Sequence, residues 1–371
     1  MKIGADIRTA CDPVSGKGRF TFSMVKELIK IQGNNEYLLY TNKINGNLGK
    51  LFAANGTSKI HIKHIGKNKL LWHFAVIKDF VNSGGDVFFA PTSFIIPAFL
   101  PEKIRSVIVI HDLVSFLYSK SHETKASIIE KLFLRKAAKK ASGIIVPSEN
   151  TKRDLMKIIN VPEKKITVVP LAAGEEFSKM PSGDEVKNLK AKYNLPNEYI
   201  LAVSGLQPRK NLSVLLDAMP EITKEHPELK LIIVGGKGWK STHTRKKIAN
   251  LGKSVVLIDS CPPHELPIFY NLAKMLVYPS LYEGFGLPAL EAMAAGCPVI
   301  CSNAGSLPEV VESAALTFNP TDIQALIEHM KNLLEDKNLH AELIKKGKNQ
   351  AKKFSWEKAA KAVAKVFSTI F

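Results

Sequence analysis

The chain has 371 residues, of which 45% are hydrophobic and 8% aromatic, and its formal net charge is +18 at pH 7. This length favours two domains over a single core, and no apolar run approaches the roughly 18 residues that a membrane-spanning helix needs. The four cysteines include no C-x-x-C pair, which argues against a disulfide scaffold and a structural zinc site. We therefore expect a two-domain protein of the reducing cytoplasm.

The positive charge is concentrated in the first half, where residues 1–180 hold 28 Lys and Arg against 15 Asp and Glu. Such an excess favours an acidic partner, which would be nucleic acid, anionic lipid or a phosphorylated ligand. A solvated, lysine-rich surface explains the charge equally well. Charge alone therefore leaves the partner open.

Short β-rich runs alternate with helical patterns along the first half of the chain. The segment MKIGADIR reaches Asp6 too early for a signal peptide and predicts a first strand. Further strands are predicted at 36–41, 86–90, 106–112, 143–148 and 166–170, and helices at 20–31 and 125–141. Most of these strands are continuously apolar, which is typical of parallel strands buried on both faces.

The second half repeats this alternation after a polar segment with Pro and Gly at 171–198, which predicts a linker. Its strands are predicted at 199–205, 230–236, 255–260, 275–280, 298–303 and 315–320, and helices at 210–219, 286–295 and 356–371. Two sets of strands predict an α/β protein with two doubly wound, Rossmann-like domains. We expect the domains at 1–172, completed by the last helix at about 356–371, and at 173–355.

The segment LYEGFGLPALEAM at 281–293 places Glu283 and Glu291 on either side of a glycine-rich turn that opens a helix. Free amides and the macrodipole at a helix N-terminus attract phosphate, and glycine allows close approach. We expect Glu291 to bind a ribose diol and Glu283 to lie beside a sugar attached to the diphosphate. Alone, each acid would be a solvated or capping carboxylate. The expected donor-binding residues of the turn are Gly284, Phe285, Gly286 and Leu287.

A second strand-to-helix junction, VSGLQPRKN at 203–211, brings Gly205, Arg209 and Lys210 together, with Asn211 as a helix cap. Two fixed cations would neutralise a diphosphate leaving group without a metal. A third turn, IIVGGKGW at 232–239, contains Gly235 but not the full G-x-G-x-x-G, so it supports a nicotinamide site weakly.

Two features of the first half point to the same kind of ligand. The loop SGKGRF at 15–20 supplies Gly16 and Gly18 before a helix, where they would face phosphates or sugar. VIVIHDL ends a buried strand with His111 and Asp112, at the edge where ligands of α/β sheets bind. His111 is a candidate contact to a sugar hydroxyl, with Asp112 in support, although an ordinary core histidine fits the pattern too.

Together these segments resemble the retaining glycosyltransferases of family 4, which have the GT-B fold. The resemblance rests on ADIR, GKGRF, HDL, VPSENTKRDL, VVPLAAGEEF, VSGLQPRKNLSVLLDA, VGGKGW, YPSLYEGFGLPALEAMAAGCPVI, SLPEV and FSWEKAA, and covers nearly the whole chain. One departure is LIDSCPPHEL at 257–266, where many members have a glycine-led strand and turn. This departure leaves the contacts to the donor base open.

The resemblance implies two domains that face each other across a cleft, and a last helix that returns to the first domain. It implies Arg209 and Lys210 on the donor diphosphate, Glu291 on the ribose, and Glu283 and His111 near the transferred sugar. The expected reaction moves a hexose from a nucleotide-diphosphate sugar, GDP-mannose before a UDP-sugar, with no metal or other cofactor. The acceptor would be a saccharide or lipid-linked saccharide of a cell-surface polysaccharide or glycolipid. Front-face attack assisted by the leaving phosphate is the favoured route to retention.

Two alternative functions remain at this point. One is another GT-B enzyme, a sugar-nucleotide epimerase or a phosphorylase, and the latter would need a lysine that carries pyridoxal. The other is a nucleic-acid-binding protein, but the sequence lacks basic-aromatic RNA-binding signatures, so we expect no nucleic acid as partner.

An anionic membrane surface is a further expected partner. Residues 120–140 are strongly basic, and residues 63–82 mix cations with apolar side chains, namely Lys63, Lys67, Lys69 and Lys78 with Leu70, Leu71, Trp72 and Phe74. Attachment would be peripheral and reversible, on the inner membrane face. Against it, the helical pattern at 128–140 lacks a clean amphipathic division and resembles a packed helix with a solvated edge.

Overall fold

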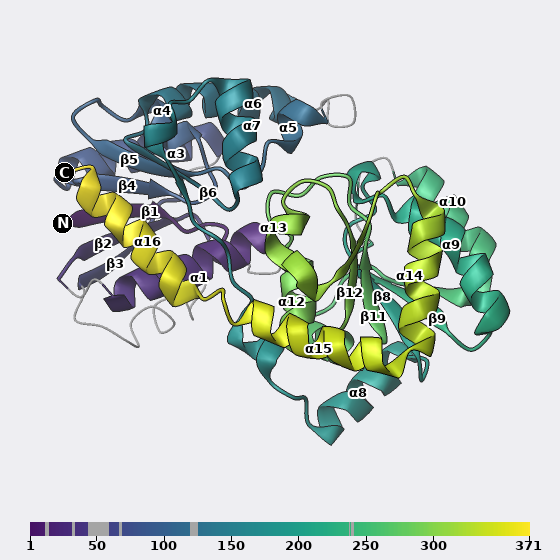
Figure 1. The fold of residues 1–371 in the computed structure, drawn as a ribbon. Coiled ribbons are helices and arrows are strands. Elements are labelled where there is room, and N and C mark those ends of the chain that lie inside the picture. Colours follow the sequence, from purple (N-terminus) through teal and green to yellow (C-terminus); the bar gives the residue numbers. More distant parts are fainter. Residues whose placement is uncertain are drawn as a thin grey trace. The chain divides into compact units, whose positions relative to one another are not determined.

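The structure is a computed structural model that describes residues 1–11, 15–31, 34–43, 59–66, 69–118, 125–236, 238 and 241–371. It divides into two compact units (Figure 1). Unit 1 comprises Met1–Leu171 and Ser355–Phe371, and unit 2 comprises Ala172–Phe354. No helix in these described ranges is both long and apolar enough to cross a membrane.

Unit 1 contains a parallel sheet in the order β3-β2-β1-β4-β5-β6-β7. Its strands are β1 (Lys2–Asp6), β2 (Glu36–Thr41), β3 (Lys59–His64), β4 (Val87–Ala90), β5 (Arg105–Val109), β6 (Gly143–Val146) and β7 (Ile166–Val168). Its helices are α1 (Gly16–Ile31), α3 (Lys69–Asn82), α4 (Ile95–Phe99), α5 (Val114–Leu117), α6 (Lys125–Lys140), α7 (Glu149–Ile159) and α16 (Trp356–Thr369).

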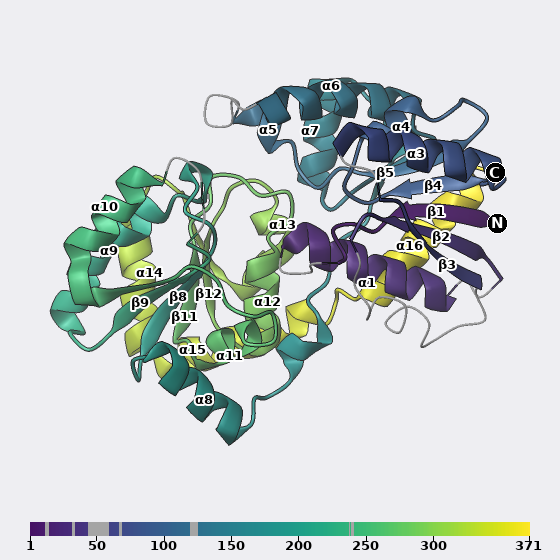
Figure 2. The same ribbon diagram turned by 180° about the vertical axis from the view of Figure 1, so that it is seen from behind.

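Helices cover both faces of this sheet (Figures 1 and 2). The final helix α16 packs beside α1 on one face, where Phe367 meets Phe89 with ring centroids 5.7 Å apart and Trp356 meets Phe20 at 5.9 Å. Helices α3, α4, α6 and α7 bury a second apolar layer against the opposite face. The end of the chain is therefore part of the core of unit 1.

Unit 2 contains a second parallel sheet in the order β10-β9-β8-β11-β12-β13. Its strands are β8 (Tyr199–Val203), β9 (Lys230–Val234), β10 (Val255–Ile258), β11 (Met275–Tyr278), β12 (Val299–Ser302) and β13 (Leu316–Phe318). Its helices are α8 (Gly183–Tyr193), α9 (Leu212–Glu225), α10 (Thr242–Leu251), α11 (Leu266–Leu272), α12 (Leu287–Ala295), α13 (Leu307–Val311), α14 (Ile323–Glu335) and α15 (Lys337–Ala351). The two-domain α/β expectation is confirmed.

Two details of the sequence prediction were wrong, and a third was incomplete. Strand β3 was missed because KIHIKH alternates polar and apolar residues at the sheet edge. Helix α1 begins at Gly16 rather than at residue 20, so the predicted glycine loop forms its first turn. The segment 171–198 does contain the division between the units, at its start, but it is not irregular throughout, since Ser182 opens α8 with a capping box to Glu185.

Candidate active site

The turn between β11 and α12 has a backbone that requires glycine. Gly286 is the N-cap of α12 with φ 112°, and a Cβ there would lie 2.5 Å from Leu307 Cδ2. Leu287 and Pro288 follow as the first helical residues, where proline is tolerated. The N-terminal amides of α12 therefore begin directly after a turn in which only glycine fits without strain.

Glu283, in this turn, is paired with both predicted cations. Its Oε1 lies 2.6 Å from Lys210 Nζ and its Oε2 3.1 Å from Arg209 Nη1. Burial would raise the pKa of the Glu283 carboxyl, but the Lys210 and Arg209 charges outweigh burial and lower that pKa to about 2. Glu283 is thus ionised at neutral pH and is only 8% exposed, which excludes the solvated carboxylate that its sequence alone allowed.

Arg209 and Lys210 are held by backbone as well as by charge. They belong to the short 3₁₀ helix Pro208–Lys210 after β8, and Arg209 O accepts from Leu281 N at 2.8 Å. Arg209 Nη1 also donates to Tyr282 O at 3.0 Å. The two strand-to-helix junctions are therefore joined directly to each other.

Two residues near this ion pair differ from expectation. Tyr278 OH accepts a hydrogen bond from Lys210 Nζ at 2.9 Å, a contact that was not predicted from the sequence. Asn211 lies at the N-cap of α9 in the left-handed region, but its side chain donates to Pro320 O at 2.7 Å and does not cap the helix. The capping prediction for Asn211 was therefore wrong.

Glu291 lies on α12 and is 1% exposed. Its Oε2 accepts a hydrogen bond from Tyr270 OH at 3.2 Å. This low exposure excludes a surface role for Glu291. Burying a carboxylate costs free energy unless hydrogen-bond donors surround it, so Glu291 needs such donors. The structure therefore places both glutamates of the opening motif in the interior of unit 2.

The loop after β12 supports the Glu283 turn and was given no role by the sequence analysis. Gly305 has φ 61°, and a Cβ there would lie 2.9 Å from both the N and O atoms of Glu283. Ser306 Oγ lies 3.0 Å from Glu283 O and 2.7 Å from Phe285 O. The pair GS at 305–306 follows a buried strand, and that position is the signal that would have identified it.

The glycine turn after β9 also comes close to the Arg209 junction. Gly235 has φ 107°, and a Cβ would lie 3.0 Å from Ser204 O and 3.5 Å from Gly205 N. The predicted glycines Gly205 and Gly235 are therefore neighbours at the carboxyl end of β8 and β9. Residues 237, 239 and 240 of the same turn lie outside the described residues.

In unit 1, His111 follows β5 and is half-buried. Its Nε2 lies 2.8 Å from Pro91 O, which can only accept, so Nε2 carries the proton and Nδ1 is an acceptor. Burial and the Lys17 charge lower the His111 pKa to about 4, against the opposing effects of Pro91 O and Asp112. The imidazole is therefore neutral at pH 7 and able to accept a hydrogen bond from a hydroxyl.

Other predicted residues of unit 1 have mainly local contacts. Asp112 Oδ1 accepts from Val114 N at 3.1 Å and so stabilises the start of α5. Gly18 N donates to Ser15 Oγ at 3.1 Å in the first turn of α1, while Gly16 is exposed with open space around it. These glycines form a helix N-terminus next to Lys17, whose charge reaches His111.

An arginine at the carboxyl end of β1 was not among the predicted site residues. Arg8 Nε and Nη2 bind Asp6 at 3.0 Å and 2.7 Å, and Nη2 lies 3.1 Å from His73 Nε2. Its guanidinium stacks 3.8 Å above the Trp72 ring. ADIR thus supplies a fixed arginine at the same sheet edge as His111.

Among the residues described, one group of side chains has the spacing that could hold a metal ion. Glu225, His226 and Glu335 have ligand atoms within 4.8 Å of one another, at the C-terminal ends of α9 and α14. This group lies at the opposite ends of α9 and α14 from the carboxyl edge of the sheet, where Arg209 and Glu283 are found. Glu225 is moreover paired with Lys331 at 2.7 Å.

Two family models match the chain in succession. Residues 14–173 match Glycosyltransferase Family 4, and residues 185–350 match Glycosyl transferases group 1. The chain belongs to glycosyltransferase family 4. The family resemblance is thereby confirmed, and the alternative of a nucleic-acid-binding protein is not favoured.

Curated relatives of this glycosyltransferase include proteins named as mannosyltransferases. O-antigen chain mannosyltransferase B of Escherichia coli is 29% identical over 369 residues, with 93% of each chain covered. The serotype-specific mannosyltransferase WbdA of Escherichia coli is 31% identical over 264 residues, which are 69% of this chain and 32% of WbdA. The chain thus spans nearly all of one relative and about a third of the other.

Solved structures show the fold. Anabaena HepE in complex with UDP-glucose has a TM-score of 0.76 at 18% identity, with both chains fully covered. WaaG, a glycosyltransferase involved in lipopolysaccharide biosynthesis, has a TM-score of 0.72 at 16% identity, with 99% of each chain covered. The GT-B fold of this glycosyltransferase is confirmed.

Proposed function

We propose that the protein transfers a hexose from a nucleotide-diphosphate sugar to a saccharide or lipid-linked saccharide, with retention at the anomeric carbon, in the synthesis of a cell-surface polysaccharide. The observation that carries this proposal is the cation pair Arg209 and Lys210, held by Glu283 beside the N-terminus of α12. Mannose is the favoured sugar because relatives such as O-antigen chain mannosyltransferase B carry that activity in their names.

The leaving group of such a reaction is a nucleoside diphosphate, and stabilising its charge would supply much of the rate enhancement. Lys210 and Arg209 are fixed before the donor arrives, because Glu283, Tyr278 and the Tyr282 carbonyl bind them. Fixed cations need no reorganisation during the reaction. They would take the role that a metal ion has in other transferases.

Glu283 is proposed to orient these cations beside the transferred sugar. Its two oxygens already contact Lys210 and Arg209, and the low pKa leaves the carboxylate weakly basic. Such a group is a poor covalent nucleophile and a poor proton donor. This supports front-face attack, in which the leaving phosphate itself takes the proton of the acceptor hydroxyl.

Glu291 is proposed to bind the ribose diol through its buried carboxylate. His111, neutral with an acceptor at Nδ1, is proposed to accept a hydrogen bond from a sugar hydroxyl. The glycines at 16, 18, 205, 235, 284 and 286 would allow close approach of donor to backbone. GDP-mannose is the first donor to test and a UDP-sugar the second, because HepE is solved with UDP-glucose.

A thermal-shift series against GDP-, UDP- and ADP-sugars tests the donor assignment. A ligand at 100 times its Kd stabilises the folded state by about 2.7 kcal/mol, which is readily measured. We expect one nucleotide series to raise the melting temperature in the presence of EDTA. Absence of a shift with all three series would contradict the proposal.

We place the reaction in the cytoplasm, at the inner face of a membrane.

A further inference from the structure

Exposed apolar side chains gather on the helices that cover one face of the sheet in unit 1. Most of the exposed large hydrophobic residues in the described ranges lie on α3, α4, α5 and α6, namely Leu70, Leu71, Phe74, Phe99, Leu117, Ile128 and Leu132. Leu71, Ile128 and Leu132 are 67%, 65% and 64% exposed. A leucine or isoleucine so exposed is ordinary when isolated, but a group of them marks an interaction site.

Aromatic contacts join these helices into one surface. Phe99 of α4 lies 5.3 Å from Phe74 of α3 and 5.6 Å from Phe133 of α6, between ring centroids. Both ribbon views show α3, α4 and α6 together on this side of the sheet (Figures 1 and 2). We call the exposed apolar residues of α3, α4 and α6 the α3–α6 surface.

Cations lie next to the aromatic rings at this surface. Lys136 Nζ lies 3.9 Å from the centroid of Phe99, and Arg135 Cζ lies 5.3 Å from that of Phe116. Along α6, the basic residues Lys131 and Arg135 alternate with the exposed pair Ile128 and Leu132. As the sequence interpretation expected, α6 is a packed helix, since Leu134, Ala137 and Ala138 are buried in the core of unit 1. The structure adds that its edge also exposes Ile128 and Leu132.

The expectation for residues 63–82 needs a different correction. Trp72 is fully buried beneath Arg8 and contributes nothing to the surface, whereas Leu70, Leu71 and Phe74 are exposed. Residues 67–68 and 119–124 and the side chain of Lys69 lie outside the described residues. The α3–α6 surface therefore includes none of these residues.

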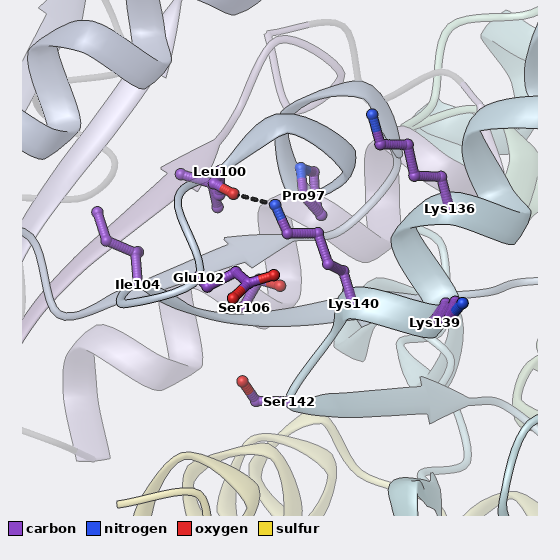
Figure 3. A pocket seen from close by; sticks show the side chains of 9 residues that line it. All are labelled: Pro97, Leu100, Glu102, Ile104, Ser106, Lys136, Lys139, Lys140 and Ser142. Atoms are coloured by element: carbon purple, nitrogen blue, oxygen red, sulfur yellow. Dashed lines mark hydrogen bonds between the residues drawn. The ribbon is translucent and has the colours of Figure 1, made fainter.

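A basic pocket adjoins this surface at the end of α6 (Figure 3). It has a volume of about 430 Å³ and is lined by Pro97, Leu100, Glu102, Ile104, Ser106, Lys136, Lys139, Lys140 and Ser142. Lys140 Nζ donates to the Leu100 carbonyl across the rim. Three lysines against one glutamate give the lining a net positive charge, and the volume is within the range of small-molecule sites.

Cations in the last turn of a helix also offset its macrodipole, and this local role explains part of the cluster. The macrodipole does not explain the cavity between the lysines and the start of β5. It also does not explain why Leu132 and Ile128, one and two turns before Lys136, are exposed. Basic side chains around exposed apolar ones are the composition that anionic bilayers bind. The lysines beside the α3–α6 surface are thus complementary in charge to a lipid phosphate.

We propose that the α3–α6 surface lies on an anionic bilayer, with its apolar side chains among the acyl chains and a lipid phosphate in the pocket of Lys136, Lys139 and Lys140. This proposal gives the membrane partner of the proposed function a specific site. It does not depend on which sugar is transferred. A protein without transferase activity would still bind vesicles through it.

Co-sedimentation with vesicles of phosphatidylcholine, alone or mixed with phosphatidylglycerol, tests the surface. We expect binding to the mixed vesicles, and about tenfold weaker binding for Lys136→Glu with Lys139→Glu. The control Lys337→Glu with Lys345→Glu makes the same charge change on the exposed face of α15 in unit 2. Equal losses in both double variants, or equal binding to both kinds of vesicle, would overturn the proposal.

Ser142→Phe distinguishes phosphate binding in the pocket from non-specific electrostatic attraction to the vesicle. The substitution fills the cavity and leaves all three lysines in place. We expect it to weaken vesicle binding as the lysine variants do, while Leu71→Ser with Leu132→Ser releases the protein at lower salt than the wild type. Unchanged binding of Ser142→Phe would refute phosphate binding in the pocket. Nucleoside diphosphate binding in solution should be the same in all variants, so a failure of the donor assignment would be seen separately in the wild type.

Discussion

Lys210 Nζ lies 2.6 Å from Glu283 Oε1, and the two side chains are only 12% and 10% exposed. The carboxylate also contacts Arg209, so one anion balances two cations in the interior of unit 2. A diphosphate would add negative charge where the protein holds an excess of positive charge. The variants below test this arrangement.

Glu283→Gln should destabilise the ligand-free protein by roughly 3 kcal/mol, because it leaves two poorly compensated cations in the interior. Urea unfolding would measure the loss. Nucleoside diphosphate should then bind more tightly than in the wild type, although turnover falls. Glu357→Gln is the control, since solvent screens the exposed pair of Glu357 with Lys361 and its loss should change stability little. Similar losses in both variants would refute a special role for Glu283.

Lys210→Met should lower turnover by about 10²–10³, the scale for one lost stabiliser of leaving-group charge. Activity of the wild type should persist in EDTA. Tyr278→Phe removes an acceptor of Lys210, and with it the interactions of the hydroxyl with Glu283 and Ser280. It should cost about 1 kcal/mol of stability with most of the turnover retained. Complete and reversible inactivation by chelator would show that a metal carries the charge instead.

Glu291→Gln keeps the shape of the buried side chain but removes its charge. We expect the donor KM to rise about 10–100-fold, because a hydrogen bond to a charged group contributes roughly 1.5–3 kcal/mol. Tyr270→Phe removes one hydrogen-bond donor to Glu291 that belongs to the protein and should change the donor KM by much less. The prediction fails if the donor KM of Glu291→Gln equals that of the wild type.

His111 should give the protein a specific pH dependence. Its folded pKa of about 4 is below the ordinary value, so the unfolded chain takes up a proton at higher pH than the folded protein. Stability therefore falls as the pH drops from 6.5 toward 4, by about 2 kcal/mol at pH 5. His111→Gln keeps a donor for Pro91 O and should not show this part of the loss. Parallel pH profiles of wild type and variant would contradict the neutral assignment.

Gly305→Ala should cost more than 1 kcal/mol and reduce turnover, although this residue is expected to touch no ligand. A Cβ at φ 61° is strained and would press on the Glu283 backbone. Gly183→Ala provides the control, because it lies in the first turn of α8 with open space around it. That variant should be neutral or slightly stabilising. Equal behaviour of the two alanine variants in thermal unfolding and turnover would exclude the supporting role.

Much of this architecture was predictable because continuous apolar runs specify buried parallel strands. All six strands of unit 2 were found in this way, as was the turn to α12 with Gly286 and Pro288. Strand β3 was missed because an edge strand with alternating polar residues lacks that signal. The start of α1 was misplaced because Gly16 and Gly18 are poor helix formers that tertiary context kept in the helix.

The candidate site was predictable as a set of residues but not as a network. Sequence spacing singled out Arg209, Lys210 and Glu283, yet their mutual pairing depends on two loops more than 70 residues apart in the chain. Tyr278 at the end of β11 and Ser306 in the loop after β12 could not be assigned from the sequence for the same reason. Long-range contacts of this kind follow from sheet order, which propensity does not encode.

Calorimetric titration of GDP and UDP into the wild type and Lys210→Met, in EDTA and with the matching monophosphates alongside, tests the central claim most directly. The account predicts that one diphosphate binds without metal, at least about tenfold more tightly than its monophosphate, and that Lys210→Met removes most of that difference. Equal binding of diphosphate and monophosphate, or unchanged diphosphate binding by Lys210→Met, would contradict it.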